Sequence, residues 1–411
     1  MAAIRNDEVT NERQYRMTIQ DRVFIAGAGP AGLVAAANLV RQGVPVTVFE
    51  AGRDLSEESR ASTFHPPTLD MLDDLGVAEA LIAQGLVAPR FQYRSRSGGL
   101  LAQFDFAAIA DLTRHPYRLQ SEQSKLTRIL YERLRGEPSF EMQFNSRVAG
   151  VEQNADGVRV AVERGGRRET HAGRWLIGAD GARSEVRRSL GIAFDGFTWG
   201  ERFLVVSTPF DFHAAIPDLV SVNYVADPER WHFLLQIPGL WRAMFPIRED
   251  ESDETALTPE FAQALMATVV VGKSDYEIAH MTLYRVHQRV AATFRLGRTF
   301  LIGDAARINN PLGGMGMNGG IHDAMNLTGR LATVWHGRSP DAELDRFEQQ
   351  RRLVTLEYIE KQTIQNKRNM ESAGTEFGEH LRNIAADAGR ARDYLTRVSM
   401  IASLRRAEEL G

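Results

Sequence analysis

The sequence predicts an α/β protein with a Rossmann-like nucleotide-binding sheet, an antiparallel sheet inserted into it and a helical C-terminal region. Three observations support this fold class. Residues 22–50 read as strand, glycine turn, helix and strand, residues 191–294 contain long stretches that alternate in β fashion, and residues 299–334 read as a second strand, glycine loop and helix. This order places the antiparallel insert between two parts of one nucleotide-binding domain.

The first unit is the most strongly patterned. Residues 22–26 form a short apolar run typical of a strand buried on both faces, and residues 30–42 carry apolar side chains at helical spacing. Pro30 near the start and Gly43 past the end are typical helix punctuation. Residues 46–49 form a second apolar strand, so the right-handed crossover predicts two parallel strands.

A glycine motif joins the first strand to this helix. Gly27, Gly29 and Gly32 have G-x-G-x-x-G spacing, and Glu50 follows 18 residues after the last glycine. Gly27 allows the tight turn, Gly29 lets a pyrophosphate approach the backbone and Gly32 permits close helix–sheet packing. The helix N-terminus offers free N–H groups, and Glu50 would accept hydrogen bonds from an adenosine ribose. The motif alone does not separate NAD from FAD.

The segments between the two glycine motifs predict antiparallel structure. Residues 148–153, 158–163 and 167–172 alternate and are separated by turn signals, so we expect a three-stranded meander laid on the parallel sheet. In the insert, residues 231–237 and 241–247 are the clearest strands. After residue 340 the chain is helical in period, and five apolar residues are its expected core contacts: Leu344, Phe347, Leu353, Leu356 and Ile364.

The predicted domains follow these segments. They comprise a mobile leader over 1–20, a discontinuous nucleotide-binding domain over 21–90, 111–190 and 295–340, a substrate-binding sheet domain over 91–110 and 191–294, and a helical region over 341–411.

Composition excludes several classes of protein. The chain of 411 residues has 49 Lys and Arg against 53 Asp and Glu, so no excess positive charge favours nucleic acid or an anionic membrane surface as a partner. It has no cysteine, which excludes disulfides and thiolate metal sites, and we expect no metal. No apolar run approaches the ~20 residues that span a bilayer. We expect a cytoplasmic location.

The second glycine-rich segment points to FAD. The strand at 299–303 delivers Asp304 to a place where its carboxylate can bind ribityl hydroxyls, and residues 311–318 form a glycine loop that leads into a helix at 321–334. The N-terminus of that helix can face the pyrimidine edge of a flavin. We assign the backbone N–H groups of Met315 and Met317 to the flavin.

These two motifs, together with Asp180 and Gly181 in the segment 175–188, resemble the three fingerprints of the class A flavoprotein aromatic hydroxylases, the family of para-hydroxybenzoate hydroxylase. The resemblance runs from about residue 22 to about 352. It implies a Rossmann-like FAD-binding domain of that type and a role for the Asp180–Gly181 pair in binding both FAD and transient NAD(P)H. It also implies that Arg60 and Gln120 contact the flavin, because both lie in segments similar to the family's.

The predicted cofactor-binding residues come from all of these segments. They are Gly27, Gly29, Pro30, Ala31, Glu50, Arg60, Gln120, Asp180, Asp304, Pro311, Gly314, Met315, Gly316, Met317 and Asn318. Three positions depart from the family's usual pattern: Arg307 replaces a frequent histidine, Asn310 a proline and Met315 a glutamine. All three are expected beside the flavin ring, where they could mark an unusual substrate geometry rather than lost binding.

The resemblance implies the reaction. NAD(P)H would deliver hydride to flavin N5, O2 would add at C4a, and the hydroperoxide would pass its distal oxygen to a small phenolic or N-heteroaromatic ring. The candidates for substrate contacts are His232, Gln236, Tyr224 and Pro311. Alternation puts His232 and Gln236 on one face of the strand 231–237 and its aromatic residues on the other, and either face could meet the flavin.

Two alternatives stay open at this point. One is a flavin halogenase or epoxidase of the same fold, although the chain has no Trp-x-Trp-x-Ile-Pro element of the tryptophan-halogenase type and no membrane anchor of the squalene-epoxidase type. The other is a non-catalytic FAD-binding protein. A homodimer is compatible with the sequence.

Overall fold

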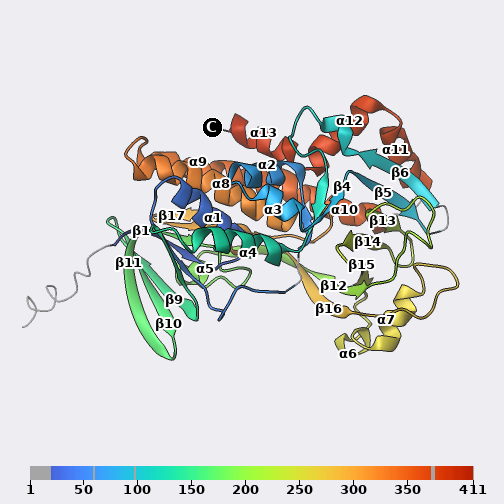
Figure 1. The fold of residues 1–411 in the computed structure, drawn as a ribbon, viewed down its shortest axis with the longest axis horizontal. Coiled ribbons are helices and arrows are strands. Elements are labelled where there is room, and N and C mark those ends of the chain that lie inside the picture. Colours follow the sequence, from blue (N-terminus) through green and yellow to red (C-terminus); the bar gives the residue numbers. More distant parts are fainter. Residues whose placement is uncertain (1–19, 59–60, 97–98, 372–374, 411) are drawn as a thin grey trace, which may run out of the picture.

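The computed structural model describes residues 20–58, 61–96, 99–371 and 375–410 (Figure 1). Two eight-stranded sheets and one three-stranded sheet lie within them. The leader expected over 1–20 falls outside the described residues, except that Gln20 begins the first strand. Arg60 also lies outside them.

The first sheet contains the predicted strand–helix–strand unit. Its strand order is β17-β18-β11-β1-β2-β8, with β10 and β9 branching from β11. β1 is parallel to both neighbours, so Val23 pairs with Val46 on one side and with Trp175 on the other. The strands are β1 (Gln20–Ala26), β2 (Val46–Phe49), β8 (Phe140–Gln143), β9 (Ser146–Gln153), β10 (Val158–Arg164), β11 (Arg167–Gly178), β17 (Arg295–Leu296) and β18 (Thr299–Leu301).

The three antiparallel strands β9, β10 and β11 are confirmed, but they are not laid on the sheet as a separate layer. β11 pairs with β10 in its first half and then runs on to Gly178, parallel to β1. The physical reason is the buried apolar run at Trp175–Ile177, which suits a strand inside a parallel sheet. One long strand therefore joins the meander to the sheet, as the long arrows near β11 show (Figure 1).

The second sheet has the order β19-β16-β12-β15-β14-β13-β5-β6. It is antiparallel, as predicted, except where β13 runs parallel to β5. Its long strands β12 and β16 reach back toward the first sheet (Figure 1). The strands are β5 (Arg90–Ser95), β6 (Gly99–Asp105), β12 (Phe194–Thr208), β13 (Val222–Ala226), β14 (His232–Ile237), β15 (Leu240–Ile247), β16 (His280–Ala291) and β19 (Arg307–Ile308).

A small third sheet holds β7 between its two partners, β3 and β4. This sheet carries two of the polar residues considered below, because Thr63 of β3 pairs with Gln120 of β7. The strands are β3 (Thr63–Phe64), β4 (Leu86–Ala88) and β7 (Arg118–Gln120).

Helices α1 and α8 pack against each other, and α1 also packs against α4. α8 begins at Met315, six residues earlier than predicted. The glycines at 316, 319 and 320 suggested a loop, but they lie in the helix, and close packing requires glycine at 319 and 320. The helices are α1 (Pro30–Arg41), α2 (Pro66–Asp74), α3 (Ala78–Ile82), α4 (Gln123–Leu134), α5 (Glu185–Ser189), α6 (Asp253–Ala256), α7 (Pro259–Met266) and α8 (Met315–Trp335), with short 3-10 turns at η1 (Phe106–Ile109) and η2 (Gly303–Ala305).

The C-terminal region is helical, as predicted. Leu344 and Phe347 are buried and Leu356 and Ile364 are partly buried, but Leu353 is 37% exposed and was assigned to the core wrongly. The reason is that α9 buries Val354 instead, just before a π-helical turn changes the helical period. The elements are η3 (Asp341–Leu344), α9 (Asp345–Val354), η4 (Thr355–Ile359), α10 (Glu360–Glu371), α11 (Thr375–Ala385), α12 (Ala388–Val398) and α13 (Ile401–Glu409).

Candidate functional site

The first glycine turn has the geometry that its motif predicts. Gly27 has φ +96°, and a Cβ there would lie 2.5 Å from the Ala179 carbonyl oxygen. A Cβ on Gly32 would lie 2.1 Å from the Gly27 oxygen, so both positions require glycine. A Cβ on Gly29 would meet no atom within 4 Å. The N-terminus of α1 therefore opens on free space, which is where a bound pyrophosphate would lie.

Glu50 holds this turn together. One carboxylate oxygen accepts a hydrogen bond from the Ala28 N–H and the other from the Gly52 N–H, both at 2.8 Å. To bind the adenosine ribose as predicted, the same two carboxylate oxygens would accept further hydrogen bonds with their second lone pairs. That role stays a prediction, but the carboxylate is held beside the turn that would bind the cofactor.

The two glycine-rich segments meet in space. Virtual Cβ atoms on Gly303 and Gly320 would each lie 3.3 Å from the Ala31 Cβ, so the start of α1, η2 and the first turns of α8 pack closely. Asp304, within η2, is exposed next to this junction. One exposed carboxylate thus lies beside the meeting point of two helix N-termini.

Asp180 has a structural role. Its carboxylate accepts hydrogen bonds from the Ser184 hydroxyl and from two backbone N–H groups at the start of α5. Burial raises the pKa of the Asp180 carboxyl, although these hydrogen bonds lower it. Arg187 of the same helix donates to the Ala305 and Ala182 carbonyl oxygens at 2.9 and 3.0 Å. The segment around Asp180 therefore supports the turn that carries Asp304.

The first turn of α8 presents the backbone groups assigned to the flavin. Gly314 precedes it in the left-handed region with φ +68°, and Met315, Gly316 and Met317 follow, so their N–H groups have no partner within the helix. The Met315 side chain itself is buried with Ile359. The Met315 side chain is thus part of the core, and only its backbone N–H is assigned to the flavin.

Polar side chains fasten this turn from outside. The Asn318 amide donates to the Thr63 and Gly314 oxygens and accepts from the His65 N–H. Asn310 donates to the Thr363 oxygen at 2.9 Å and accepts from the Leu312 N–H at 3.1 Å. Asn318 was predicted to bind the cofactor; the structure shows a side-chain role in holding this turn that the spacing did not indicate.

His65 is a site residue that the sequence reasoning missed. Its Nε2 lies 2.7 Å from the Gly313 carbonyl oxygen, which can only accept, so Nε2 carries the proton. Burial, together with the positive charge of Arg118, lowers the pKa of His65 to about 3, and the ring is neutral at physiological pH. Nδ1 is a buried acceptor with no protein partner among the described residues. A lone histidine after a strand carries no local signal of this placement.

Gln120 is fully buried on β7. Its Oε1 accepts from the Thr63 hydroxyl at 2.9 Å, while its Nε2 is buried and has no partner among the described residues. An unsatisfied buried amide N–H costs about 1–3 kcal/mol unless a ligand accepts from it. This donor is therefore available to a cofactor carbonyl.

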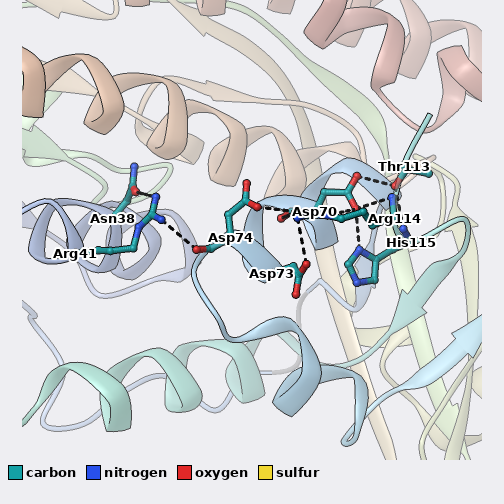
Figure 2. Close-up of polar contacts among 8 residues, drawn as sticks. All are labelled: Asn38, Arg41, Asp70, Asp73, Asp74, Thr113, Arg114 and His115. Atoms are coloured by element: carbon teal, nitrogen blue, oxygen red, sulfur yellow. Dashed lines mark hydrogen bonds and ion pairs between the residues drawn. The ribbon is translucent and has the colours of Figure 1, made fainter. Parts of the chain in front are cut away.

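Carboxylates of α2, above all that of Asp70, bind the loop before β7 (Figure 2). Asp70 accepts from the Thr113 hydroxyl at 2.7 Å, from the Arg114 N–H at 3.1 Å and lies 2.7 Å from His115 Nδ1. Arg114 also pairs with Asp74 at 2.7 Å. These contacts fix the start of β7, and with it the position of Gln120.

The two faces of the second sheet bury different clusters, and only one of these clusters includes a residue of the glycine bend. Trp231, Phe233 and Tyr224 lie in a cluster that includes Leu312, next to Pro311 at the glycine bend. His232 and Gln236 lie on the other face. The His232 ring is 5.4 Å from Phe245, a residue of the opposite cluster, and Gln236 accepts from the Ser221 hydroxyl and contacts His213.

The structure therefore places Tyr224 in the cluster beside Pro311, and His232 and Gln236 on the opposite face of the sheet. Strand alternation had been read correctly, but which face meets the glycine bend depends on how the sheets pack. The cluster around Tyr224, called here the aromatic face, combines ring side chains from the sheet, η1 and the C-terminal helices. Its aromatic members are Phe91, Tyr93, Phe104, Phe106, Trp199, Phe203, Tyr224, Trp231, Phe233, Tyr284, Phe377 and Tyr394.

His232→Phe should retain activity and reduce acid sensitivity. Burial lowers the pKa of His232 from 6.5 to about 4, so the unfolded chain binds a proton between these pH values that the folded chain does not. The stability that neutral His232 contributes is fully present above pH 6.5 and declines as the pH falls toward 4. When the pH is lowered from 7 to 5, the unfolding free energy measured by urea titration should fall by roughly 2 kcal/mol less in the variant than in the parent. An equal loss in both proteins would contradict this account.

The described residues contain no group of three or more His, Cys, Asp or Glu side chains placed to hold a metal ion. In the same part of the chain, every helix is too short or too polar to cross a membrane.

Comparisons with known proteins agree on one family. A family model described as "FAD binding domain" matches residues 20–362. Para-nitrophenol 4-monooxygenase from Pseudomonas sp. (strain WBC-3) is 35% identical over 346 residues, 83% of this chain and 85% of that protein. 6-Hydroxy-3-succinoylpyridine 3-monooxygenase from Pseudomonas putida is 35% identical over 391 residues, 92% of this chain and 98% of that protein.

Solved structures resemble this fold closely. The crystal structure of p-nitrophenol 4-monooxygenase from Pseudomonas putida superposes with a TM-score of 0.88 at 30% identity, covering 95% of this chain and 99% of that chain. A complex of aklavinone-11 hydroxylase with FAD and aklavinone superposes with a TM-score of 0.75 at 27% identity, covering 87% and 69%.

Proposed function

We propose, on the premise that this chain belongs to the class A family of FAD-dependent aromatic hydroxylases, that its substrate is a one-ring phenol or hydroxypyridine. The chain is an FAD-dependent monooxygenase, and use of NAD(P)H and O2 is typical of its family. Two relatives named for a nitrophenol and a hydroxypyridine match it over most of their length. The observation that carries the proposal is the aromatic face, which belongs to one buried cluster with Leu312 of the glycine bend.

The residues present fit FAD. Three independent features support this fit: open space at Gly29 before α1, the exposed Asp304 carboxylate at the junction of the two glycine segments, and the Nε2 of buried Gln120, which has no partner among the described residues. We propose that the α1 N-terminus binds the pyrophosphate and that Asp304 accepts from ribityl hydroxyls. The α8 N-terminus and Gln120 would then hold the ring.

FAD, when bound, supplies the redox and oxygen chemistry. The chain's own residues position the substrate ring and exclude water. The aromatic face offers apolar walls, and the carbonyl oxygen of Pro311 is fixed because it accepts from the Gly314 N–H at 2.9 Å. Neutral His65 holds the Gly313 carbonyl, so that the bend keeps one shape. Apolar walls beside a fixed bend would exclude water and so favour oxygen transfer to a ring over reaction with water.

The test is turnover with a panel of phenols and hydroxypyridines. We expect ring-stimulated NAD(P)H oxidation and a product heavier by one oxygen atom. Turnover that needs halide would indicate a halogenase instead, and turnover only with polycyclic rings would overturn the one-ring proposal. A cytoplasmic location and a homodimeric state stay predictions, which cell fractionation and sedimentation would check.

A further inference from the structure

Arg118 is a buried cation for which the described residues provide no anion. Its side chain is 2% exposed, and no carboxylate of the described residues lies within ion-pairing distance. Nη1 donates to the Tyr224 hydroxyl at 3.2 Å, while Nε is buried and has no partner in the described chain. A buried charge is strongly destabilising unless an opposite charge compensates it.

Several other buried arginines of this protein do have such a partner. Arg242, on β15, is 5% exposed and pairs with Glu122 at 3.0 Å. Arg307 and Arg351 share the buried carboxylate of Asp323. At Arg118 a bound anion would supply the charge that the described residues do not provide.

Arg118 lies between the cofactor-binding residues and the aromatic face. It is two residues from Gln120 on the same face of β7, about 7 Å along the strand. Its guanidinium is 4.6 Å from the centre of the Phe91 ring and 5.5 Å from that of Phe106. Its charge also lowers the pKa of His65, which contacts the glycine bend.

The tyrosines near Arg118 do not supply the anion. The Tyr93 hydroxyl lies 2.9 Å from that of Tyr394, and the Tyr93 ring stacks on Tyr224 at 5.2 Å. Burial raises the pKa of Tyr93 well above its usual value and that of Tyr394 to about 12, so both stay protonated. Neutral hydroxyls and one guanidinium form a site for an oxygen anion on an aromatic ring.

We propose that Arg118 binds the ionised hydroxyl of the substrate, so that the ring is held as a phenolate, with Tyr224 beside it. This inference rests on the proposed function and names the form of the substrate that the site takes. The phenol loses its proton to the buffer before binding. The ionised oxygen makes the ring more electron-rich at the ortho and para carbons, as an electrophilic oxygen transfer requires.

The test uses FAD-loaded protein with 4-nitrophenol, whose phenolate absorbs visible light, at a pH below its pKa in free solution. We expect the wild type to bind it with the phenolate band. Arg118→Met should lose this band and bind at least about 30-fold more weakly. Nitrobenzene, which has no hydroxyl, should bind both proteins equally. Arg242→Met is the matched control, because it removes a buried arginine that already has a partner, and it should keep the band.

Arg118→Lys is a second variant, which serves if Arg118→Met folds poorly. It retains the positive charge and should keep part of the phenolate band. The inference is overturned if Arg118→Met binds 4-nitrophenol as phenolate like the wild type. It is also overturned if nitrobenzene binding falls by the same factor, because the arginine would then serve the nitro group or the fold. Failure of the proposed function is distinct, since it would appear as no phenol-stimulated turnover in the wild type.

Discussion

Gly29→Asn should abolish tight FAD binding and leave the apoprotein folded. Gly29 has φ −70° and ψ 178°, which any residue can adopt, and its virtual Cβ meets nothing within 4 Å. Asparagine is also a favoured residue at this N-cap position of α1. Its side chain would occupy the free space and bond the N–H groups that a pyrophosphate needs. We expect FAD affinity to fall roughly 100-fold, about 2.7 kcal/mol.

Titration of flavin-free protein with FAD, followed by flavin fluorescence, measures this effect, and the melting temperature of the apoprotein measures the fold. Gly27→Ala is the matched control in the same motif. Its Cβ would lie 2.5 Å from the Ala179 oxygen at φ +96°, so both affinity and stability should fall. A Gly29→Asn protein that keeps its yellow colour through gel filtration would show that the cofactor does not approach this turn.

Asp323→Ala should be among the most destabilising single substitutions in the chain. Asp323 is fully buried, and its carboxylate binds Arg307, Arg351 at 2.8 Å and the Gly303 N–H at 3.2 Å. Its removal leaves two buried guanidinium groups without an anion. The expected cost is about 3–5 kcal/mol of unfolding free energy.

Urea unfolding of flavin-free protein gives the measurement. Asp341→Ala, which removes a carboxylate that is 57% exposed and paired with Arg295, is the control and should cost about 0–1 kcal/mol. Because Asp323 also holds Gly303, which precedes Asp304, we expect weaker flavin retention in Asp323→Ala as well. Equal urea midpoints for the two variants would disprove the role assigned to the buried network.

The local parts of the cofactor site could be predicted from sequence because their physics is local. Gly27 and Gly32 belong to one strand–turn–helix unit, and their spacing identifies them, although the close contact that excludes a side chain at Gly27 comes from Ala179 on a distant strand. The strands of the insert were predictable for the same reason, since alternation reports a sheet with two different faces. The start of α8 was not predictable, because Gly320 looks like a loop residue until its packing on Gly303 is known.

Arg307 illustrates the limit of pattern comparison. Its departure from the family's usual histidine was expected to mark unusual substrate geometry beside the flavin. The structure shows that its guanidinium binds Asp323 and lies against α8, where a Cβ on Gly319 would come within 2.2 Å of it. It belongs to a buried ion network, whose members are far apart in the chain.

The sequence by itself determined the cofactor class and the strand–helix–strand frame, because these depend on residues within short, regularly spaced segments. Only the tertiary structure decided which face of the second sheet meets the glycine bend. It therefore placed His232 on the opposite face and brought Arg118, His65 and Tyr224 together. Those residues come from two different sheets and a helix N-terminus and carry no shared spacing, and their chemistry arises from mutual burial, which no local pattern encodes.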